Sequence, residues 1–246
     1  MVRAISRGRR TAALVVAALA GLGIWFAFAR IGAKHTPTGV FTSLPLTWNE
    51  AASVGAILQS DESPHWARET IAGGGRLVPL DVLDARSLAA LRQLVIAQPR
   101  PLTPAENVAL DAWVRQGGRV LLIADPMLTE PSIFPLGDPR RPQPVVLLSP
   151  ILTHWGLELR FADAQPLGPR VATALGGPVV VDLAGQFVAT AGGSCRTEDG
   201  GLVARCTIGN GGVVAFADGA VLARDAAGPT QSRALSRLLA AAFRPE

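Results

Sequence analysis

The chain has 246 residues, of which 49% are hydrophobic, and this is enough for one sizeable core. Its formal charge of +4 comes from the first 34 residues, which hold six bases and no acid. The remaining 17 of the 23 basic residues face 19 acidic ones, so the body is near neutral. A nucleic-acid partner is therefore not expected.

Residues 12–29, AALVVAALAGLGIWFAFA, form an uncharged segment at the lower limit of the length that spans a bilayer as a helix. Four arginines precede the segment, and the positive-inside rule then places the N-terminus in the cytoplasm. The alternative is a cleaved signal peptide, because Ala27-Phe28-Ala29 fits a cleavage site. Both interpretations export the body of the chain.

We expect a single-pass protein of the inner membrane that contacts lipid through residues 12–29 and has a periplasmic body. The predicted division is a basic tail over residues 1–11, an anchor over residues 12–30, a linker over residues 31–39 and an exported domain over residues 40–246.

The body alternates predicted strands and helices, which is typical of an α/β domain with a mostly parallel sheet and helices on both faces. Strands are predicted over residues 40–46, 76–80, 94–97, 120–124, 157–162, 179–183, 187–191 and 213–217. Helices are predicted over residues 49–58, 64–72, 84–92, 104–116, 150–155 and 231–243, with N-caps at Ser63, Asp84, Thr103 and Ser149.

The helix over residues 104–116 has the strongest local signals. Thr103 is its N-cap, Pro104 occupies the first position, and Glu106 completes a capping box. Gly117 supplies a left-handed stop, and a continuous apolar run follows, as in a strand that is buried on both faces. The proline-rich stretch over residues 126–144 is then long enough to predict a functional loop or an inserted arm.

The two cysteines lie in GGSCRTEDGGLVARCTIG, which reads as a β-hairpin. With Gly200 and Gly201 as a two-residue loop, Cys195 faces Cys206 on a hydrogen-bonded pair. We predict a disulfide that contributes about 2–3 kcal/mol and agrees with export. A catalytic thiol is the alternative, but neither cysteine has a histidine nearby in sequence, and a metal site needs more ligands.

No catalytic motif accompanies these elements. The glycine-rich stretches GGGRLV, GGRVLL and GNGGVV precede strands, whereas phosphate-binding loops follow a strand and open a helix. The three histidines, His35, His65 and His154, lack a second histidine at ligand spacing. We therefore predict no catalytic residues, no metal site and no cofactor.

Polar residues follow several predicted strands, at the edge of a parallel sheet where ligand crevices lie. They are Asp81, Gln98, Asp125 with the adjoining Pro126, and Asp218. One interpretation makes these residues a ligand- or partner-binding rim, with Asp125 and Asp218 facing each other. The other makes each carboxylate a cap of the backbone turn that follows it.

Three stretches in the same order resemble the gliding-motility-type ABC transporter auxiliary family. They are LTPAENVALDAWVRQGGRVLLIADP, SPILTHWGLEL and GNGGVVAFADGAVLARD, and the resemblance covers about residues 40–245. It implies an exported flavodoxin-like domain related to the class I glutamine amidotransferase-like domains. The cysteine nucleophile of those enzymes has no counterpart here, so the resemblance implies a non-enzymatic derivative. A C-terminal membrane helix, present in longer members, is not expected.

The leading functional hypothesis is thus a non-enzymatic, membrane-anchored periplasmic component of an ABC-type transport or surface system, with permease or ATPase subunits as partners. A stand-alone module that binds a small molecule or glycan at the rim is the alternative. A hydrolase or amidotransferase relative is a remote third hypothesis, because the sequence offers no Cys–His pair.

Overall fold

The computed structural model describes residues 36–51, 55 and 63–244. The predicted tail, the predicted anchor and most of the linker lie outside these residues, as does most of the predicted helix over residues 49–58. No helix within the described residues is long and apolar enough to cross a bilayer. Thr36 begins the structural unit that contains every described helix and strand.

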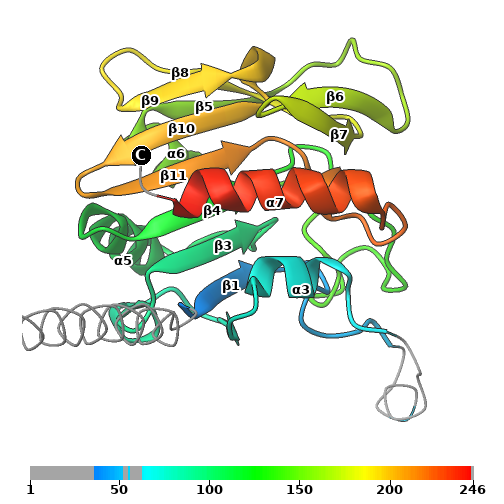
Figure 1. The fold of residues 1–246 in the computed structure, drawn as a ribbon, viewed down its shortest axis with the longest axis horizontal. Coiled ribbons are helices and arrows are strands. Elements are labelled where there is room, and N and C mark those ends of the chain that lie inside the picture. The colour runs from blue at the N-terminus through cyan, green and yellow to red at the C-terminus, as the bar shows by residue number, and fades with distance from the viewer. Residues whose placement is uncertain (1–35, 52–54, 56–62, 245–246) are drawn as a thin grey trace, which may run out of the picture. The chain divides into compact units, whose positions relative to one another are not determined.

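A seven-stranded sheet with the order β2-β1-β3-β4-β11-β10-β9 organises this unit (Figure 1). The first five of these strands are parallel, and their order along the chain is 2-1-3-4-5, as in flavodoxin-like doubly wound sheets. The strands, in sheet order, are β2 (Leu77–Pro79), β1 (Thr38–Thr42), β3 (Gln93–Ala97), β4 (Arg119–Ile123), β11 (Gly211–Phe216), β10 (Val203–Ile208) and β9 (Cys195–Glu198). The predicted α/β class, with a mostly parallel sheet and an antiparallel hairpin, is confirmed.

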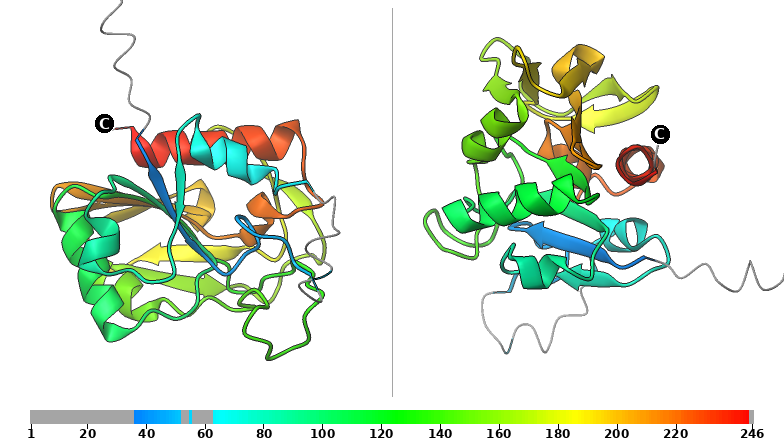
Figure 2. Two further views of the ribbon diagram at one scale, coloured as in Figure 1. Left: turned by 90° about the horizontal axis from the view of Figure 1, so that it is seen from below. Right: turned by 90° about the vertical axis from the view of Figure 1, so that its left-hand side faces the viewer.

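Helices cover both faces of the sheet (Figure 2). One face carries α3 (Ala67–Ala72) and α7 (Pro229–Phe243), and the other carries α5 (Pro104–Arg115) and α6 (Ser149–Trp155), with α4 (Ala85–Leu88) beside α5. Two small antiparallel sheets pair β5 (Leu157–Phe161) with β8 (Gly185–Ala189) and β6 (Arg170–Ala174) with β7 (Gly177–Val181). Short 3-10 turns, η1 (Asp199–Gly201) and η2 (Gly219–Leu222), follow β9 and β11.

The core lies on β3, β4 and β11. Residues 94–97 and 120–124 are almost fully buried, and every residue of β11 is buried. Strands covered on both faces have no polar side to show, which is why they appear in the sequence as continuous apolar runs. The three strands predicted from such runs, over residues 94–97, 120–124 and 213–217, are confirmed, and β11 begins two residues earlier than predicted.

The N-caps predicted for α4 and α5 are confirmed, and those predicted for α3 and α6 are wrong. Thr103 and Glu106 form the expected capping box of α5, and Asp84 caps α4, which ends at Leu88 rather than at residue 92. The cap predicted at Ser63 is wrong, because α3 begins at Ala67 and the imidazole of His65 accepts the Ala67 amide. Ser149 is also no cap: it lies inside α6, which starts after Leu148 without a side-chain cap.

Two strands, β1 and β6, differ from what the sequence predicted. β1 begins at Thr38, inside the predicted linker, and ends at Thr42 rather than at residue 46. The Leu44 amide bonds the hydroxyl of Thr42, so the chain turns away from the sheet there. The strand β6 was missed, since RVATA is short and lies between glycine- and proline-containing turns that resemble a loop.

The predicted disulfide joins Cys195 and Cys206, which face each other across β9 and β10. The pair was expected on a hydrogen-bonded position, and this is wrong. The turn contains four residues, and the amide of Thr207 bonds the carbonyl of Ser194, so the cysteines occupy the adjacent non-hydrogen-bonded position. Their Cα atoms are 4.0 Å apart, within the close spacing of such pairs.

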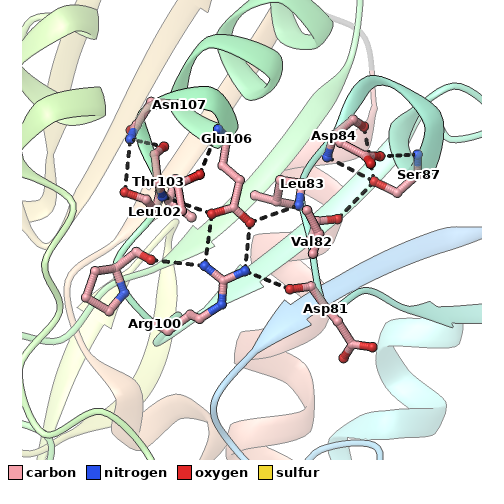
Figure 3. A network of polar contacts seen from close by, with 11 residues as sticks. Asp81, Val82, Leu83, Asp84, Ser87, Arg100, Leu102, Thr103, Glu106 and Asn107 are labelled. Carbon is pink, nitrogen blue, oxygen red and sulfur yellow. Dashed lines mark hydrogen bonds and ion pairs between the residues drawn. The ribbon is translucent and has the colours of Figure 1, made fainter.

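Arg100, which follows β3, forms an ion pair with Glu106 of α5, and both side chains also bind the backbone of the segment after β2 (Figure 3). Arg100 Nη2 lies 2.7 Å from Glu106 Oε1, and Nη1 lies 2.9 Å from Oε2. Glu106 also accepts the amide of Leu83 at 3.2 Å, and Arg100 donates to the carbonyl of Asp81 at 2.7 Å. Hydrogen bonds from Arg100 are the main cause that lowers the pKa of the buried Glu106 to about 2.

We predict that Glu106→Gln destabilises the fold by about 2 kcal/mol near neutral pH, because the ion pair is lost. The pKa of Glu106 lies below its unfolded value of 4.5, so its contribution is present above that pH and is lost as the pH falls toward 2. Urea unfolding at about pH 7 and about pH 3 should therefore show a large and then a small difference from wild type. Glu69→Gln is the matched control, as Glu69 is an exposed helical glutamate. An equal deficit at both pH values would contradict this account.

Candidate functional site

The carboxyl ends of the parallel strands meet at one edge of the sheet, called here the carboxyl rim. Gln98 follows β3, Asp125 follows β4 and Asp218 follows β11. All three side chains are buried, with exposed fractions of 0%, 1% and 0%. The structure thus brings three of the predicted rim residues together.

Gln98 joins the end of β3 to the end of β4. Its Oε1 accepts the Asp125 amide at 2.9 Å, and its Nε2 donates to the Asp125 carbonyl at 3.0 Å and to the Gln143 carbonyl at 2.8 Å. The backbone of Gln98 has a φ of 40°, a left-handed conformation that is uncommon for a residue other than glycine. The hydrogen bonds to three carbonyl and amide groups hold it in this conformation.

The crevice between β1 and β3 is the switch point, where flavodoxin-like folds bind ligands. Here the hydroxyl of Ser43, just after β1, donates to the carbonyl of Gln98 and accepts the Gln143 amide at 2.9 Å. Gln143 belongs to the long loop between β4 and α6. This loop therefore closes the switch point with polar contacts.

Asp125 and Asp218 each bind two backbone amides. Asp125 Oδ1 accepts from Met127 at 2.7 Å, and its Oδ2 accepts from Gly219 at 2.8 Å. Asp218 Oδ1 accepts from Ala220 at 2.7 Å, and its Oδ2 accepts from Asp182 at 2.8 Å. Each carboxylate caps its own turn and also holds a second segment.

Burial raises the pKa of Asp125 to about 6 and that of Asp218 to about 8, and the charge of Asp125 adds to the shift at Asp218. The negative charge of Asp182 acts in the same direction on both. Its Oδ1 is buried without a hydrogen-bond partner within the described part of the chain. The three carboxyl groups therefore form a cluster, in which the raised pKa of Asp218 keeps that group protonated near neutral pH.

Asp81 and Pro126 lie outside this cluster. Asp81 is exposed beyond β2, an edge strand separated from β4 by β1 and β3. Pro126 packs against Gly185 at the start of β8, where a Cβ atom would come within 2.8 Å of the proline ring. The structure therefore gathers fewer residues at the rim than the sequence predicted, because Asp81 and Pro126 do not belong to the cluster.

Two adjoining pockets, called the rim pockets, open beside the cluster. The first has a volume of about 420 Å³ and is lined by residues including Pro45, Glu50, Ser132, Ile133 and Arg224. The second has a volume of about 390 Å³ and is lined by residues including Thr129, Val180, Asp182 and Ala223. Both share Glu130, Pro131 and Asp225. The part of the lining between Thr129 and Ile133 belongs to the loop over residues 126–144 that the sequence predicted to be functional. The sequence did not single out Glu50, Asp182 or Asp225.

The rim pockets carry more acid than base. Glu50 accepts from the Ser132 hydroxyl at 2.8 Å and from the Ile133 amide at 2.9 Å, and Glu130 accepts the Arg224 amide at 3.2 Å. Burial is the main cause that raises the pKa of Glu130. The described lining includes no cysteine or histidine, and no group of described residues has the composition of a metal site. The arrangement suits binding of hydrogen-bond donors.

His65 and the cysteines do not line the rim pockets. Burial, followed by the charge of Arg224, lowers the pKa of His65 to about 4, so its imidazole is neutral. The ring accepts a hydrogen bond from the amide of Ala67, the first residue of α3. Cys195 and Cys206 are joined in the disulfide on β9 and β10.

No protein-family model and no curated protein matches the sequence. Among solved structures, the chain is similar to exo-β-1,4-mannosidase Op5Man5 from Opitutaceae bacterium strain TAV5, with 17% identity and a TM-score of 0.51 over 89% of this chain and 38% of that one. A β-galactosidase from Bacillus circulans sp. alkalophilus has 11% identity and a TM-score of 0.45 over 84% and 30% of the two chains. A ThuA-like protein from Bacteroides uniformis ATCC 8492 has 12% identity and a TM-score of 0.47 over 87% and 91%.

The chain thus spans only 38% of the mannosidase and 30% of the galactosidase. The likeness to the mannosidase is one of fold, and at 17% identity no substrate or activity follows from it.

We predict that the carboxyl cluster makes the fold less stable as the pH rises. The folded pKa of Asp218, about 8, exceeds the unfolded value of 3.8, so ionisation is resisted in the folded state and stability falls between these values. Above about pH 6 Asp125 no longer contributes, and Asp218 alone should give a slope on the order of 1 kcal/mol per pH unit up to about pH 8.

Denaturant unfolding of wild type and Asp218→Asn between about pH 6 and pH 9 measures this slope. The variant should show a flatter curve, whatever its stability at one pH, because it cannot ionise. Asp163→Asn is the control, as Asp163 is an exposed aspartate away from the cluster. Parallel curves for wild type and Asp218→Asn would refute the assignment.

Proposed function

We propose that the protein is a non-enzymatic, membrane-anchored periplasmic component of an ABC-type transport or surface system, and that its α/β domain binds a partner at the carboxyl rim. One observation carries the binding role. The rim pockets are open, whereas the carboxylates behind them are committed to backbone amides. The resemblance of the three sequence stretches to the auxiliary family supports the transport context.

The disulfide supports export. Disulfides persist in oxidising compartments such as the periplasm and are rare in the cytosol. Cys195 and Cys206 account for both cysteines of the chain. Its body is therefore chemically suited to the compartment that the positive-inside rule predicts.

The long loop supports a protein partner. It exposes Ile133, Leu136, Val145 and Leu147, with exposed fractions of 60%, 82%, 44% and 56%. The loop is held firmly, by Gln98 at Gln143 and by Glu50 at Ser132 and Ile133. Apolar side chains on a fixed arm beside a pocket form the kind of surface that binds another protein.

We predict that the full chain, cross-linked in native membranes and purified, recovers a permease or ATPase subunit. Leu136→Asp should lower that recovery by about tenfold, because a charge would be buried in the apolar contact. Leu167→Asp is the matched control, since Leu167 is 87% exposed and lies outside this loop. Failure of the wild-type chain to recover any transporter subunit would overturn the proposal.

A stand-alone binding module is the second candidate, and the two rim pockets favour it. Their combined lining of Glu50, Glu130, Asp182 and Asp225 against Arg224 suits a small molecule rich in N–H or O–H donors.

For this candidate we predict that spermidine or a neutral disaccharide raises the melting temperature of wild type. The rise should be lost in Glu130→Gln and kept in Glu158→Gln, because Glu158 lies on the exposed side of β5. Equal shifts in both variants, or none in wild type, would exclude rim binding of these probes.

A further inference from the structure

The amino ends of the parallel strands form the edge opposite the carboxyl rim, called here the amino edge. The strand register places Thr38, Gln93, Arg119 and Gly212 in a single row across β1, β3, β4 and β11. In Figure 1 the arrows of β1, β3 and β11 point away from this edge, and the last turn of α7 lies beside it.

Arginines gather at the amino edge. Arg76 accepts the Thr38 amide through its carbonyl at 3.0 Å, and Arg92 accepts the Arg119 amide in the same way at 3.0 Å. These backbone contacts fix Arg76 and Arg92 beside the first row of the sheet. Both are exposed, and their side chains have no ion-pair partner among the described residues.

A hollow of about 200 Å³ continues the basic surface onto the face that carries α7. Its lining includes Arg119, Arg196, Arg205 and Arg244, together with the backbone of residues 209–212. No acidic side chain belongs to its described lining. Glu198 pairs with Arg205 at 3.0 Å and lies 3.4 Å from Arg196.

The near-neutral body is thus polar in its charge. The rim pockets are lined by Glu50, Glu130, Asp182 and Asp225 and by one arginine, Arg224. The amino edge instead holds Arg76 and Arg92, which have no ion-pair partner among the described residues. Opposite charges at opposite ends of one domain create a field that orients it near a charged surface.

The chain enters the domain at the basic end. Thr38 lies in the same row as Arg119, two strands away, so their Cα atoms are about 10 Å apart. Residues 30–37 connect the predicted membrane segment to Thr38, and eight residues extend at most about 28 Å. The chain therefore enters the domain at the edge that carries these arginines.

We propose that the amino edge rests on the membrane surface, where its arginines bind the phosphate groups of anionic phospholipids. The inference rests on the membrane anchor of the proposed function. Guanidinium groups suit this role, because they bind phosphate oxygens in pairs and remain charged at all physiological pH values. The rim pockets and the long loop then point away from the bilayer, toward partners in the aqueous compartment.

The test places the full chain in lipid nanodiscs of pure phosphatidylcholine or of equal parts phosphatidylcholine and phosphatidylglycerol. Hydrogen exchange is followed in peptides that contain Arg76, Arg92 and Arg119 and in the loop peptide around Leu136. At low salt we expect edge peptides to exchange about threefold or more slowly in phosphatidylglycerol discs, with no change in the loop peptide. About 0.5 M salt should abolish the difference, because exposed charges are then screened.

Matched variants isolate the arginines. Arg76→Gln with Arg92→Gln should remove most of the lipid-dependent protection of the edge. Arg68→Gln with Arg233→Gln should leave it intact, because these exposed arginines lie near the N-terminal ends of α3 and α7, toward the carboxyl rim. Equal loss in the two double variants would overturn the proposal, since a general charge effect would then explain the protection.

Resistance to alkaline extraction from phosphatidylcholine membranes measures the anchor separately. An inserted chain whose edge exchanges equally in both lipid compositions overturns the amino-edge proposal and leaves the anchor in place. A chain that is extracted overturns the anchor, and the edge is then tested by flotation with preformed phosphatidylglycerol vesicles. Flotation lost only in the Arg76 and Arg92 variant would support the basic edge, and absent or unchanged flotation would overturn it.

Discussion

Three buried strands that end together create a solvation problem that shapes this domain. The backbone amides beyond β3, β4 and β11 emerge where little water can reach them, and each needs an acceptor. Gln98, Asp125 and Asp218 supply these acceptors and, in doing so, connect β4 to η2 and the β7–β8 connection to β11. The consequence is electrostatic: carboxylates placed in a dry site, beside one another, hold their protons more tightly than in water.

The same constraint means that the buried side chains at the rim stabilise the fold, while other residues form its accessible surface. Asp125 and Asp218 are placed where ligands bind in doubly wound sheets, but their oxygens already accept backbone amides. The accessible surface is supplied instead by Glu50 and Glu130, whose loops cover the strand ends. A rim of this kind has a rigid polar base and an outer layer that can vary without disturbing the core.

The sequence predicted those parts of the fold that depend on local chemistry. The capping box of Thr103 and Glu106 lies within four residues, and it was found. The start of α3 was missed because the buried imidazole of His65 displaces the nearby Ser63–Pro64 signal. At the rim, strand ends identified Gln98, Asp125 and Asp218, whereas Asp182 reaches the cluster from a distant turn that no spacing rule connects to it.

In the cysteine hairpin, two properties are separate: which residues face each other, and which of these facing pairs are hydrogen-bonded. A two-residue loop and the observed four-residue turn both place Cys195 opposite Cys206, so the pairing was predictable. The longer turn shifts the alternation of hydrogen-bonded pairs by one position, which brings the cysteines onto the closer kind of pair. The residues Asp199-Gly200-Gly201 did not determine the length of the turn, because glycines suit the two-residue loop and the four-residue turn alike.

The distribution of charge over the domain likewise depends on the fold and not on composition alone. Net charge describes the body as nearly neutral, yet Arg76, Arg92 and Arg119 lie at one end of the parallel strands and the carboxylates of the rim pockets lie at the other. Helix dipoles explain part of this, since Arg115 ends α5 and Arg244 follows α7, where positive charge is favourable. They do not explain Arg76, Arg92 and Arg119, which lie four residues beyond the last residues of α3, α4 and α5 and so outside the last helical turn, where the dipole acts. The basic edge therefore exceeds what the stability of the fold requires, and that excess is what points to a negatively charged surface.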